Sequence, residues 1–440
     1  MSNSLLSLQK QIPVIGSYDV VVCGGGCAGF IAAISAARCG KSVALIERLS
    51  FFGGTATGGY VVPISGFFFQ EQQVVGGIAW EFVQRLEAIG AAMVEYPKGN
   101  ISVNIEYYKL IAQEMLLDSG VALYTNSYLS SAFTAETEHG TAVTHAVIES
   151  KNGTEAIAGR CFIDATGDGD LAHLAGVPML PPAEHLQPAS LCFVLSNVNT
   201  DTDLLRYCIH HDGKHGASCN KIIRSRLLEI AEKNGISEFG GPWFNVLLKG
   251  NSIAVNITRA EVNATDRAAY TEAECKLRRD MFRIVDLLRQ EFEEFRDCEI
   301  VSSGINAGIR ETRHIKGLHT MTLSDVLDGT VFDCPVAHCA HPMDIHAAKG
   351  AGQQLTSLKA NCFVPYEATV AEGFPNLLTA GRCISAEREP YASLRVQATL
   401  MSIGECAGVA ASLACDTDAP VYALPTDTLA EKIAARKVVL

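Results

Sequence analysis

Five polar residues in one stretch of the chain could handle a substrate. They are Arg310, Arg313, His341, Asp344 and His346. A neutral histidine accepts a proton near pH 7 without large tuning, and an arginine pairs bidentately with a carboxylate or carbonyl group. Asp344 and His346 are two residues apart, so in a strand both side chains would share one face. The carboxylate would fix the histidine tautomer and raise its basicity, and we predict that these five residues are catalytic.

A structural interpretation of the same residues stays open. Arg310 and Arg313 would form an ion-pair network with Glu311 or Asp333. His346 would be a half-buried histidine whose hydrogen bonds are satisfied. Structural networks perturb polar groups as often as active sites do.

Cysteine and histidine residues are concentrated between residues 334 and 346, where they could ligate Zn²⁺. They are Cys334, His338, Cys339, His341 and His346. Their spacing matches no compact Cys/His site, and Pro335 and Pro342 favour an irregular loop, so we predict no bound metal. The chain has no C-x-x-C sequence, which argues against a redox-active dithiol, and no cysteine group has iron–sulfur spacing.

A glycine-rich turn near the start of the chain has the spacing of a dinucleotide-binding site. The run from Gly24 through Gly26 to Gly29 satisfies G-x-G-x-x-G. The first glycine permits a tight turn, the second lets the backbone approach a pyrophosphate, and the third lets helix and strand pack closely. A helix N-terminus would present free N–H groups to the diphosphate. Glu47 follows 23 residues after Gly24 and would accept hydrogen bonds from ribose hydroxyls.

The elements around this turn form a β-α-β unit. We predict a buried parallel strand at 18–23, a helix at 30–39 that Gly40 ends, and a second buried strand at 42–46. This context predicts that the turn binds a dinucleotide, but it does not separate FAD from NAD.

The rest of the chain divides into segments of different character. We predict an antiparallel meander at 129–133, 142–149 and 156–163, a strand at 252–257, a helix at 106–117 and a long charged helix at 271–295. A late strand is predicted at 377–380, before an Ala/Gly-rich helix at 396–415. The expected domains are the first part of a nucleotide domain at 1–185, with an irregular connecting segment at 60–100, a substrate or cap domain at 186–370, and the last part of the nucleotide domain at 371–440.

The composition excludes several classes of protein. The 440 residues are 48% hydrophobic and 19% charged, with a net charge of −13 and no Lys/Arg run, so we expect neither nucleic-acid nor anionic-membrane binding. The 15 cysteines lie at irregular spacings, which favours a reducing compartment over a disulfide framework. Residues 18–39 are apolar, but their glycines fit a strand, turn and helix better than a membrane span. We find no secretory signal at 1–17 and expect a cytoplasmic protein.

Three further segments decide which dinucleotide is expected, through a resemblance. Residues 18–26, Glu47 and the glycine-rich residues 53–59 resemble the opening of glutathione-reductase-like flavoproteins. Residues 161–170 resemble the internal strand end of that superfamily, and residues 376–383 its late strand. The resemblance is closer still to a bacterial FAD-dependent oxidoreductase family, through residues 308–317, 325–326, 332–333, 344–346, 364–366, 376–385 and 393–408. Residues 186–303 carry no recognised motif.

This resemblance implies an α/β protein with a Rossmann-like, glutathione-reductase-type FAD-binding domain and an inserted α+β substrate domain. It implies FAD as the cofactor, and the helix that begins near Arg395 would lie at the pyrimidine edge of the flavin. The residues expected to contact FAD are Gly24, Gly26, Cys27, Ala28, Gly29, Glu47, Arg48, Gly53, Gly54, Thr55, Ala56, Leu129, Thr166, Gly167, Asp168, Gly381, Arg382, Arg395, Val396 and Gln397. This sequence departs from the family at Glu367 and at residues 388–390, so the substrate class cannot be carried over.

The first functional hypothesis is an FAD-dependent dehydrogenase or oxidase that moves a hydride from a small polar organic substrate to the flavin N5. The second runs in the other direction and reduces an activated alkene, as fumarate-reductase-like proteins do. A third is a non-catalytic nucleotide-binding protein that kept the fold. Flavin-dependent RNA modification is disfavoured by the net charge of −13. Without a second G-x-G-x-x-G unit, the electron partner is the substrate, a quinone, another protein or oxygen, and a homo-oligomer is compatible with the sequence.

Overall fold

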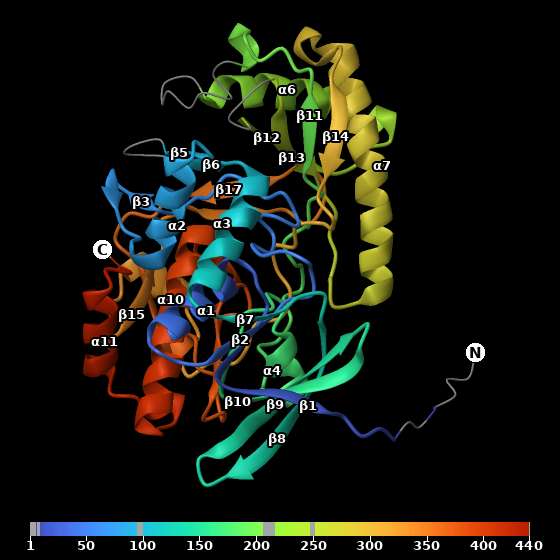
Figure 1. The fold of residues 1–440 in the computed structure, drawn as a ribbon. Coiled ribbons are helices and arrows are strands. Elements are labelled where there is room, and N and C mark those ends of the chain that lie inside the picture. The colour runs from blue at the N-terminus through green and yellow to red at the C-terminus, as the bar shows by residue number, and fades with distance from the viewer. Residues whose placement is uncertain (1–5, 7–8, 95–99, 206–215, 247–250, 440) are drawn as a thin grey trace.

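Runs of β-branched and aliphatic residues build two separate sheets in this protein. The computed structural model describes residues 6, 9–94, 100–205, 216–246 and 251–439 (Figure 1). The larger sheet contains both the first and the last strand of the chain. The smaller sheet lies at the top of Figure 1.

The larger sheet is built around the glycine-rich opening of the chain. Its parallel strands are β1 (Val14–Cys23), β2 (Val43–Ile46), β7 (Ala122–Tyr124), β10 (Gly153–Asp164) and β19 (Leu377–Thr379). Its antiparallel strands are β8 (Tyr128–Thr137) and β9 (Gly140–Ser150). The order is β7-β2-β1-β10-β9-β8, and β19 pairs with the last three residues of β10. Residues from positions 14 and 377 thus meet in one sheet.

Helices pack on this sheet and on one another. They are α1 (Cys27–Arg38), α2 (Gly77–Ala88), α3 (Ile105–Asp118), α4 (Asp170–Ala175), α9 (Arg388–Leu394), α10 (Gln397–Thr417) and α11 (Thr426–Ala435). α1 and α10 pack closely, because a Cβ on Gly404 would lie 2.1 Å from the backbone oxygen of Ala28. α10 is long and apolar enough to cross a membrane, but its apolar stretch is entirely buried inside the fold, as is typical of a core helix.

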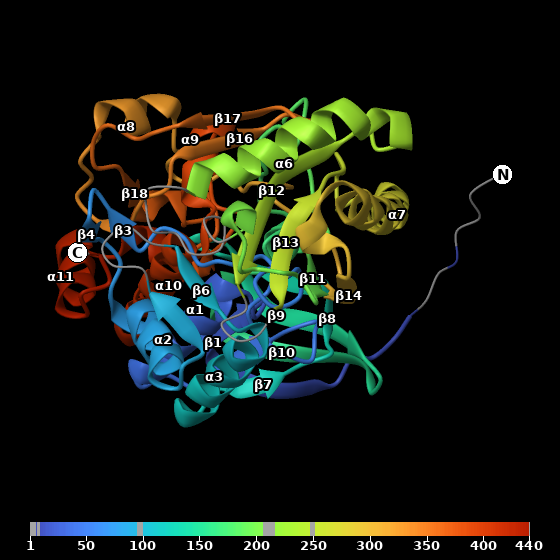
Figure 2. The same cartoon turned by 90° about the horizontal axis from the view of Figure 1, so that it is seen from above.

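The smaller sheet is antiparallel and has its own core. Its order is β12-β13-β11-β14. The strands are β11 (Phe193–Ser196), β12 (Phe239–Val246), β13 (Ile253–Thr258) and β14 (Glu299–Ser303), and the helices are α6 (Gly216–Ile230) and α7 (Arg267–Glu291). Figure 2 shows α6 and α7 beside this sheet. The core of this domain runs from Ala189 to Ile309.

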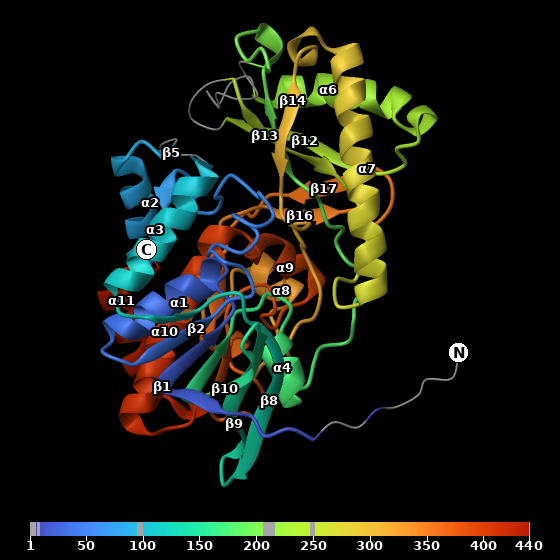
Figure 3. The ribbon, with the colours of Figure 1, turned by 45° about the vertical axis from the view of Figure 1, so that its right-hand side comes forward.

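Short elements lie outside the two main sheets. The strands are β3 (Phe68–Phe69), β4 (Gln72–Gln73), β5 (Ala92–Val94), β6 (Ile101–Val103), β15 (Pro335–His338), β16 (Met343–His346), β17 (Gln353–Thr356) and β18 (Phe363–Pro365). The helix α8 (Leu323–Asp328) and the short 3-10 helices at Glu232–Asn234, Glu293–Phe295, Tyr366–Ala368 and Val421–Ala423 complete the fold. Figure 3 shows the hairpin β16–β17 between the two sheets.

The predicted Rossmann-like α/β class is confirmed, as are the opening β-α-β unit, the meander and the long helices. The irregular segment predicted at 60–100 is wrong in part, because α2 lies inside it. Its buried residues recur at helical spacing: Ile78, Ala79, Phe82, Val83 and Leu86. The second core ends well before the predicted boundary at 370, since residues such as Met321, Val336 and Tyr366 pack into the first core.

Candidate functional site

Two of the three motif glycines are required by the fold itself. Gly24 has a φ of +101°, which favours glycine, and a Cβ there would lie 2.4 Å from the backbone oxygen of Ala165. A Cβ on Gly29 would lie 1.8 Å from the backbone oxygen of Gly24. This glycine therefore lets α1 approach β1.

Gly26 has no such internal constraint. Its φ is −66°, and the nearest heavy atom to an added Cβ, the Cα of Gly54, would be 3.8 Å away. The next residue begins α1, and no side chain caps the first N–H groups of this helix. A helix N-terminus with free N–H groups favours an anionic group such as a diphosphate. Gly26 keeps open the space that such a group would need, so this turn fits a dinucleotide.

Glu47 directly follows β2, beside the glycine turn. It is buried, and its carboxylate accepts hydrogen bonds from the backbone N–H groups of Gly25 at 2.6 Å and Leu49 at 2.8 Å. Burial raises the pKa of the Glu47 carboxyl above its ordinary value, and those N–H groups oppose the rise. Each carboxylate oxygen has a further lone pair, so Glu47 can still accept hydrogen bonds from ribose hydroxyls.

A cavity of about 90 Å³ lies along this corner. Fourteen of the residues predicted to contact the cofactor line it: Gly24, Gly26, Cys27, Ala28, Glu47, Arg48, Gly54, Thr55, Thr166, Gly167, Gly381, Arg382, Arg395 and Gln397. The ends of β1, β2, β10 and β19 bring these residues together, because the carboxyl ends of parallel strands share one edge of a sheet.

The other predicted contacts lie elsewhere. Val396 lines a larger neighbouring cavity. Gly29 and Gly53 line neither cavity, and Gly53 donates its N–H to the backbone oxygen of Gly25. Ala56 and Leu129 line neither cavity, and Leu129 pairs with Ile148 inside the meander. Sequence reasoning missed four lining residues of the smaller cavity: Leu49, Ala165, Asn306 and Leu400.

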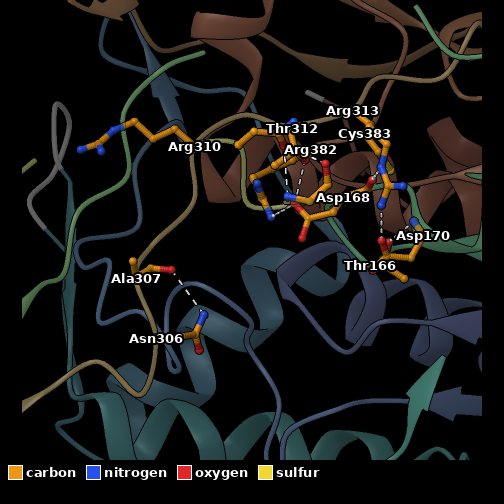
Figure 4. A network of polar contacts seen from close by, with 12 residues as sticks. Thr166, Asp168, Asp170, Asn306, Ala307, Arg310, Thr312, Arg313, Arg382 and Cys383 are labelled. Atoms are coloured by element: carbon orange, nitrogen blue, oxygen red, sulfur yellow. Dashed lines mark hydrogen bonds and ion pairs between the residues drawn. The ribbon is translucent and has the colours of Figure 1, made fainter. Parts of the chain in front are cut away.

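Asp168 lines neither cavity and holds a residue that lines both. It pairs with Arg382 at 3.0 Å and accepts a hydrogen bond from Thr312 (Figure 4). Burial alone raises the pKa of Asp168, but Arg382 holds that pKa below the ordinary value. Nη1 of Arg382 is buried without a hydrogen-bond partner among the described residues. Buried polar groups are normally satisfied, so this atom is available to a ligand.

A larger cavity of about 640 Å³ adjoins the first and lies between the two sheets. The two cavities share Thr55, Arg382, Arg395 and Gln397. Four of the five predicted catalytic residues line the larger cavity: Arg310, His341, Asp344 and His346. The nucleotide corner therefore opens into a polar chamber.

Arg313, the fifth predicted catalytic residue, lies outside this chamber. It donates to the backbone oxygen of Asp168 at 2.8 Å and pairs with the carboxylate of Asp170. Figure 4 shows Arg310 pointing away from this network. The structural interpretation thus holds for Arg313, with Asp170 as its partner in place of Glu311 or Asp333.

His346 and Asp344 share one face of β16, as their spacing predicts. His346 Nε2 lies 3.0 Å from a carboxylate oxygen of Asp344, and its Nδ1 lies 2.9 Å from a guanidinium nitrogen of Arg259. Because arginine can only donate, Nδ1 is the acceptor and Nε2 carries the proton. Burial, with the charge of Arg310, lowers the pKa of His346 to about 3, so the ring is neutral at pH 7. Both nitrogens are occupied, and this favours a positioning role.

His341 has a free ring nitrogen in the same cavity. Its Nδ1 lies 2.7 Å from the backbone oxygen of Pro342 and must donate to it. Nε2 then carries a lone pair and has no hydrogen-bond partner among the described residues. Burial lowers the pKa of His341 below its ordinary value. The ring is therefore neutral at pH 7 and can accept a proton.

The N-terminus of α10 lies where the two cavities meet. Gln397 donates its side-chain amide to the backbone oxygen of Val61 at 2.9 Å. Arg395 donates to the backbone oxygen of Asp344 at 2.9 Å, while its Nε is buried without a partner among the described residues. No side chain caps the helix. This terminus combines free N–H groups with a cation, as an electron-rich ring edge would require.

The smaller sheet supplies lining residues that no sequence motif marked. They include Trp243, Phe244, Asn245 and Asn256. They lie in the segment 186–303, and only the pairing of β12 with β13 brings them over the nucleotide corner. Alternation along β12 could have suggested which residues share a face, but it could not have shown which face meets the cavity.

The described residues contain no group of three or more His, Cys, Asp or Glu side chains placed to hold a metal ion. His338 instead contacts Asn361 at 3.2 Å, and Cys334 and Cys339 are buried in the core.

Comparisons with known proteins agree with this geometry. Residues 19–433 match the model of a family described as FAD dependent oxidoreductase. A dihydrolipoyl dehydrogenase from Trypanosoma brucei brucei is 43% identical over 55 residues, a match that spans 12% of this chain and 12% of that protein.

Solved structures also resemble this chain. A geranylgeranyl bacteriochlorophyll reductase-like protein from Thermoplasma acidophilum has a TM-score of 0.48 and 14% identity, and the match covers 96% of this chain and 83% of that one. A flavoprotein/dehydrogenase from Cytophaga hutchinsonii has a TM-score of 0.45 and 13% identity over 91% and 79%. The myxobacterial chondrochloren halogenase CndH has a TM-score of 0.47 and 12% identity over 96% and 79%.

Proposed function

The chain belongs to the FAD dependent oxidoreductase family, and from that premise we propose that it oxidises a small polar organic substrate in the larger cavity. When bound, FAD supplies the hydride acceptor. The protein's own tasks are then to hold the nucleotide, to position the substrate and to accept the substrate's proton.

One observation carries the proposal: the nucleotide corner and the polar chamber are adjoining cavities with four shared lining residues. The amides at Gly26 and the N-terminus of α1 would hold the diphosphate, and Glu47 the ribose. Arg382, Arg395 and the N-terminus of α10 would hold the ring-bearing part, since their unpartnered nitrogens lie at the junction.

We assign the role of proton acceptor to His341. Its Nε2 faces no protein partner among the described residues, and Pro342 fixes its tautomer. Because its pKa is lowered, His341 is ready to accept a proton at neutral pH. Asp344 and His346 would hold Arg395 and the hairpin β16–β17 in place around the substrate.

The proposal includes a cytoplasmic location, which the free cysteines of the described residues, most of them buried, support.

An anaerobic bleaching screen tests the proposal. The FAD-loaded protein is mixed with amines, hydroxy acids, sugars and enoates, and the flavin absorption band is followed. We expect a C–H donor to bleach it. Bleaching by none of the donors, together with reoxidation of the chemically reduced protein by an enoate, would instead support the alkene reductase. No redox response of the bound FAD would contradict both.

His341→Gln tests the assigned proton acceptor in the same assay. We expect FAD content to be unchanged and bleaching to slow by about 100-fold, because a positioned base contributes that order of rate. In the parent, the rate should fall as the pH drops through the lowered pKa of His341, and the variant should lose this acidic limb. His319→Gln is the control, since His319 pairs with Asp325 and lines neither cavity. A parental rate in His341→Gln removes His341 from the reaction.

A further inference from the structure

The larger cavity carries a charge opposite to that of the whole chain. Its charged lining residues are Lys221, Arg224, Arg310, Arg382, Arg395 and Asp344. Only one of them is acidic, although the chain as a whole has a net charge of −13. A cationic cavity in an acidic protein concentrates anionic ligands.

Most of these cations already have a partner. Arg382 pairs with Asp168 at 3.0 Å, and Arg395 lies 3.5 Å from Asp344. Arg224 donates to the backbone oxygens of Gly241 and Ala351. These bonds fix the three guanidinium groups to the protein.

Arg310 is the exception among the four arginines, and the remaining cation, Lys221, is exposed. Its Nη1 donates to the backbone oxygen of Pro188 and, at 2.9 Å, to Ser190 Oγ. Its Nη2 and Nε have no hydrogen-bond partner, and no carboxylate lies within 4.0 Å, among the described residues. Its backbone oxygen accepts from the hydroxyl of Tyr391, which holds the residue in place. One guanidinium edge is therefore anchored and the other is left to the cavity.

Burial lowers the pKa of Arg310 to about 10, and the nearby charge of Arg395 acts in the same direction. Arg310 remains charged at pH 7, but its environment does not favour the charge. An anion on the free edge would compensate it with charge-assisted hydrogen bonds.

Part of the lining of the cavity is apolar. Trp243, Phe244 and Leu355 line it, and Trp243 and Leu355 are 42% and 58% exposed. Exposed large apolar side chains in a concave site favour a ligand that covers them.

We propose that the substrate is an organic monocarboxylate with an apolar or aromatic body, whose carboxylate binds the free edge of Arg310. This assignment deepens the proposed function and rests on it for the role of the cavity. A single unpaired guanidinium matches one negative charge in a planar, two-oxygen group, which favours a carboxylate over a phosphate dianion.

Binding to the FAD-loaded protein tests this assignment without turnover. The probes are benzoate, phenylacetate and 3-phenylpropionate, each compared with its neutral amide, and with phenyl phosphate. Affinity is measured by calorimetry and by perturbation of the flavin spectrum. We expect at least one carboxylate to bind about tenfold or more tightly than its amide, since charged hydrogen bonds are worth that much.

The variant Arg310→Gln should remove this preference and leave amide binding unchanged. Arg310→Lys keeps the charge but lacks the two parallel N–H donors of a guanidinium group, so it should retain only part of the carboxylate affinity. Arg226→Gln is the matched control: Arg226 lies on the same helix as Arg224, pairs with Glu229 and Glu291, and lines neither cavity. It should behave like the parent.

Equal affinity for every acid and its amide, or a carboxylate preference that survives in Arg310→Gln, would overturn the assignment. Tighter binding of phenyl phosphate than of any carboxylate would also overturn it. These outcomes are separate from failure of the proposed function, in which carboxylates bind through Arg310 but no donor bleaches the flavin.

Discussion

At the scale of single residues, residues of the same type have different roles in this protein. Gly29 is a glycine because α1 must approach β1, whereas Gly26 is a glycine although none of the residues that the structure describes fills the space beside it. His346 has both ring nitrogens bonded, whereas His341 has one left free. Residue type alone could not separate these roles, because each depends on which atoms of other segments lie beside the residue.

The two glycines give a matched test. Gly26→Ala should fold like the parent, because no heavy atom lies within 3.8 Å of the new Cβ, but its FAD affinity should fall by about tenfold or more. Gly29→Ala should lose about 3 kcal/mol of unfolding free energy through overpacking. Thermal unfolding of the FAD-free proteins and titration with FAD measure both effects. Parental FAD affinity in Gly26→Ala would show that the diphosphate binds elsewhere.

At the scale of elements, α10 joins the site to the core. Its first residue, Gln397, lines both cavities, and about two turns later Gly404 packs against α1. Glu405, the next residue, is 1% exposed and accepts a hydrogen bond of 2.7 Å from the backbone N–H of Ile78 in α2. Burial raises the pKa of Glu405 to about 7. This helix therefore carries an ionisable group at its packing face.

Glu405 should make the stability of the fold depend on pH. The folded state keeps the proton up to about pH 7, whereas the unfolded chain releases it near 4.5. The folded state thus binds more protons in that window, and stability should fall as the pH rises through it. Glu405→Gln should remove about 3 kcal/mol of this dependence, at about 1.4 kcal/mol for each pKa unit. Denaturant unfolding between pH 4.5 and 8 measures the difference.

The control for this experiment is Glu431→Gln, an exposed position on α11. It should keep the parental pH dependence. If the Glu405→Gln variant and the parent lose stability in parallel between pH 4.5 and 7, Glu405 does not titrate as inferred.

At the scale of the whole molecule, two arginines connect the hairpin β16–β17 to the domain of the smaller sheet. Arg259, which follows β13 and is 1% exposed, donates to the backbone oxygens of Gly350 and Gly352 and to His346. Arg224 of α6 donates to the backbone oxygen of Ala351. The hairpin lies between the two sheets, so these contacts set how the domain of the smaller sheet covers the cavity (Figure 3).

Arg259→Met should loosen this connection. It leaves His346 Nδ1 and two backbone oxygens without their donor, which should cost about 3 kcal/mol of unfolding free energy. Limited proteolysis should cut the 347–352 segment about tenfold faster, since local opening becomes easier. FAD affinity should be unchanged, because Arg259 lines neither cavity. Arg267→Gln, an exposed arginine on α7, is the control.

A parental cleavage rate in Arg259→Met would show that other contacts hold the hairpin. Loss of FAD from that variant would show that the two cavities are coupled through the smaller sheet.

The sequence by itself determined the nucleotide corner. Gly24, Gly26, Gly29 and Glu47 lie within one β-α-β unit, where strand, turn and helix follow from neighbouring residues and can be read from local patterns. The pairing of Asp344 with His346 was also predicted, because residues two apart in a strand share a face.

Only the tertiary structure decided the chamber and the roles within it. Arg259, 87 residues away in the chain, donates a hydrogen bond to His346. Asp168 and Asp170, about 140 residues upstream, hold Arg313 outside the cavity. The lining from β12 and β13 carries no motif. Contacts between distant segments depend on how two separately formed cores pack together, and no pattern of neighbouring residues specifies that packing.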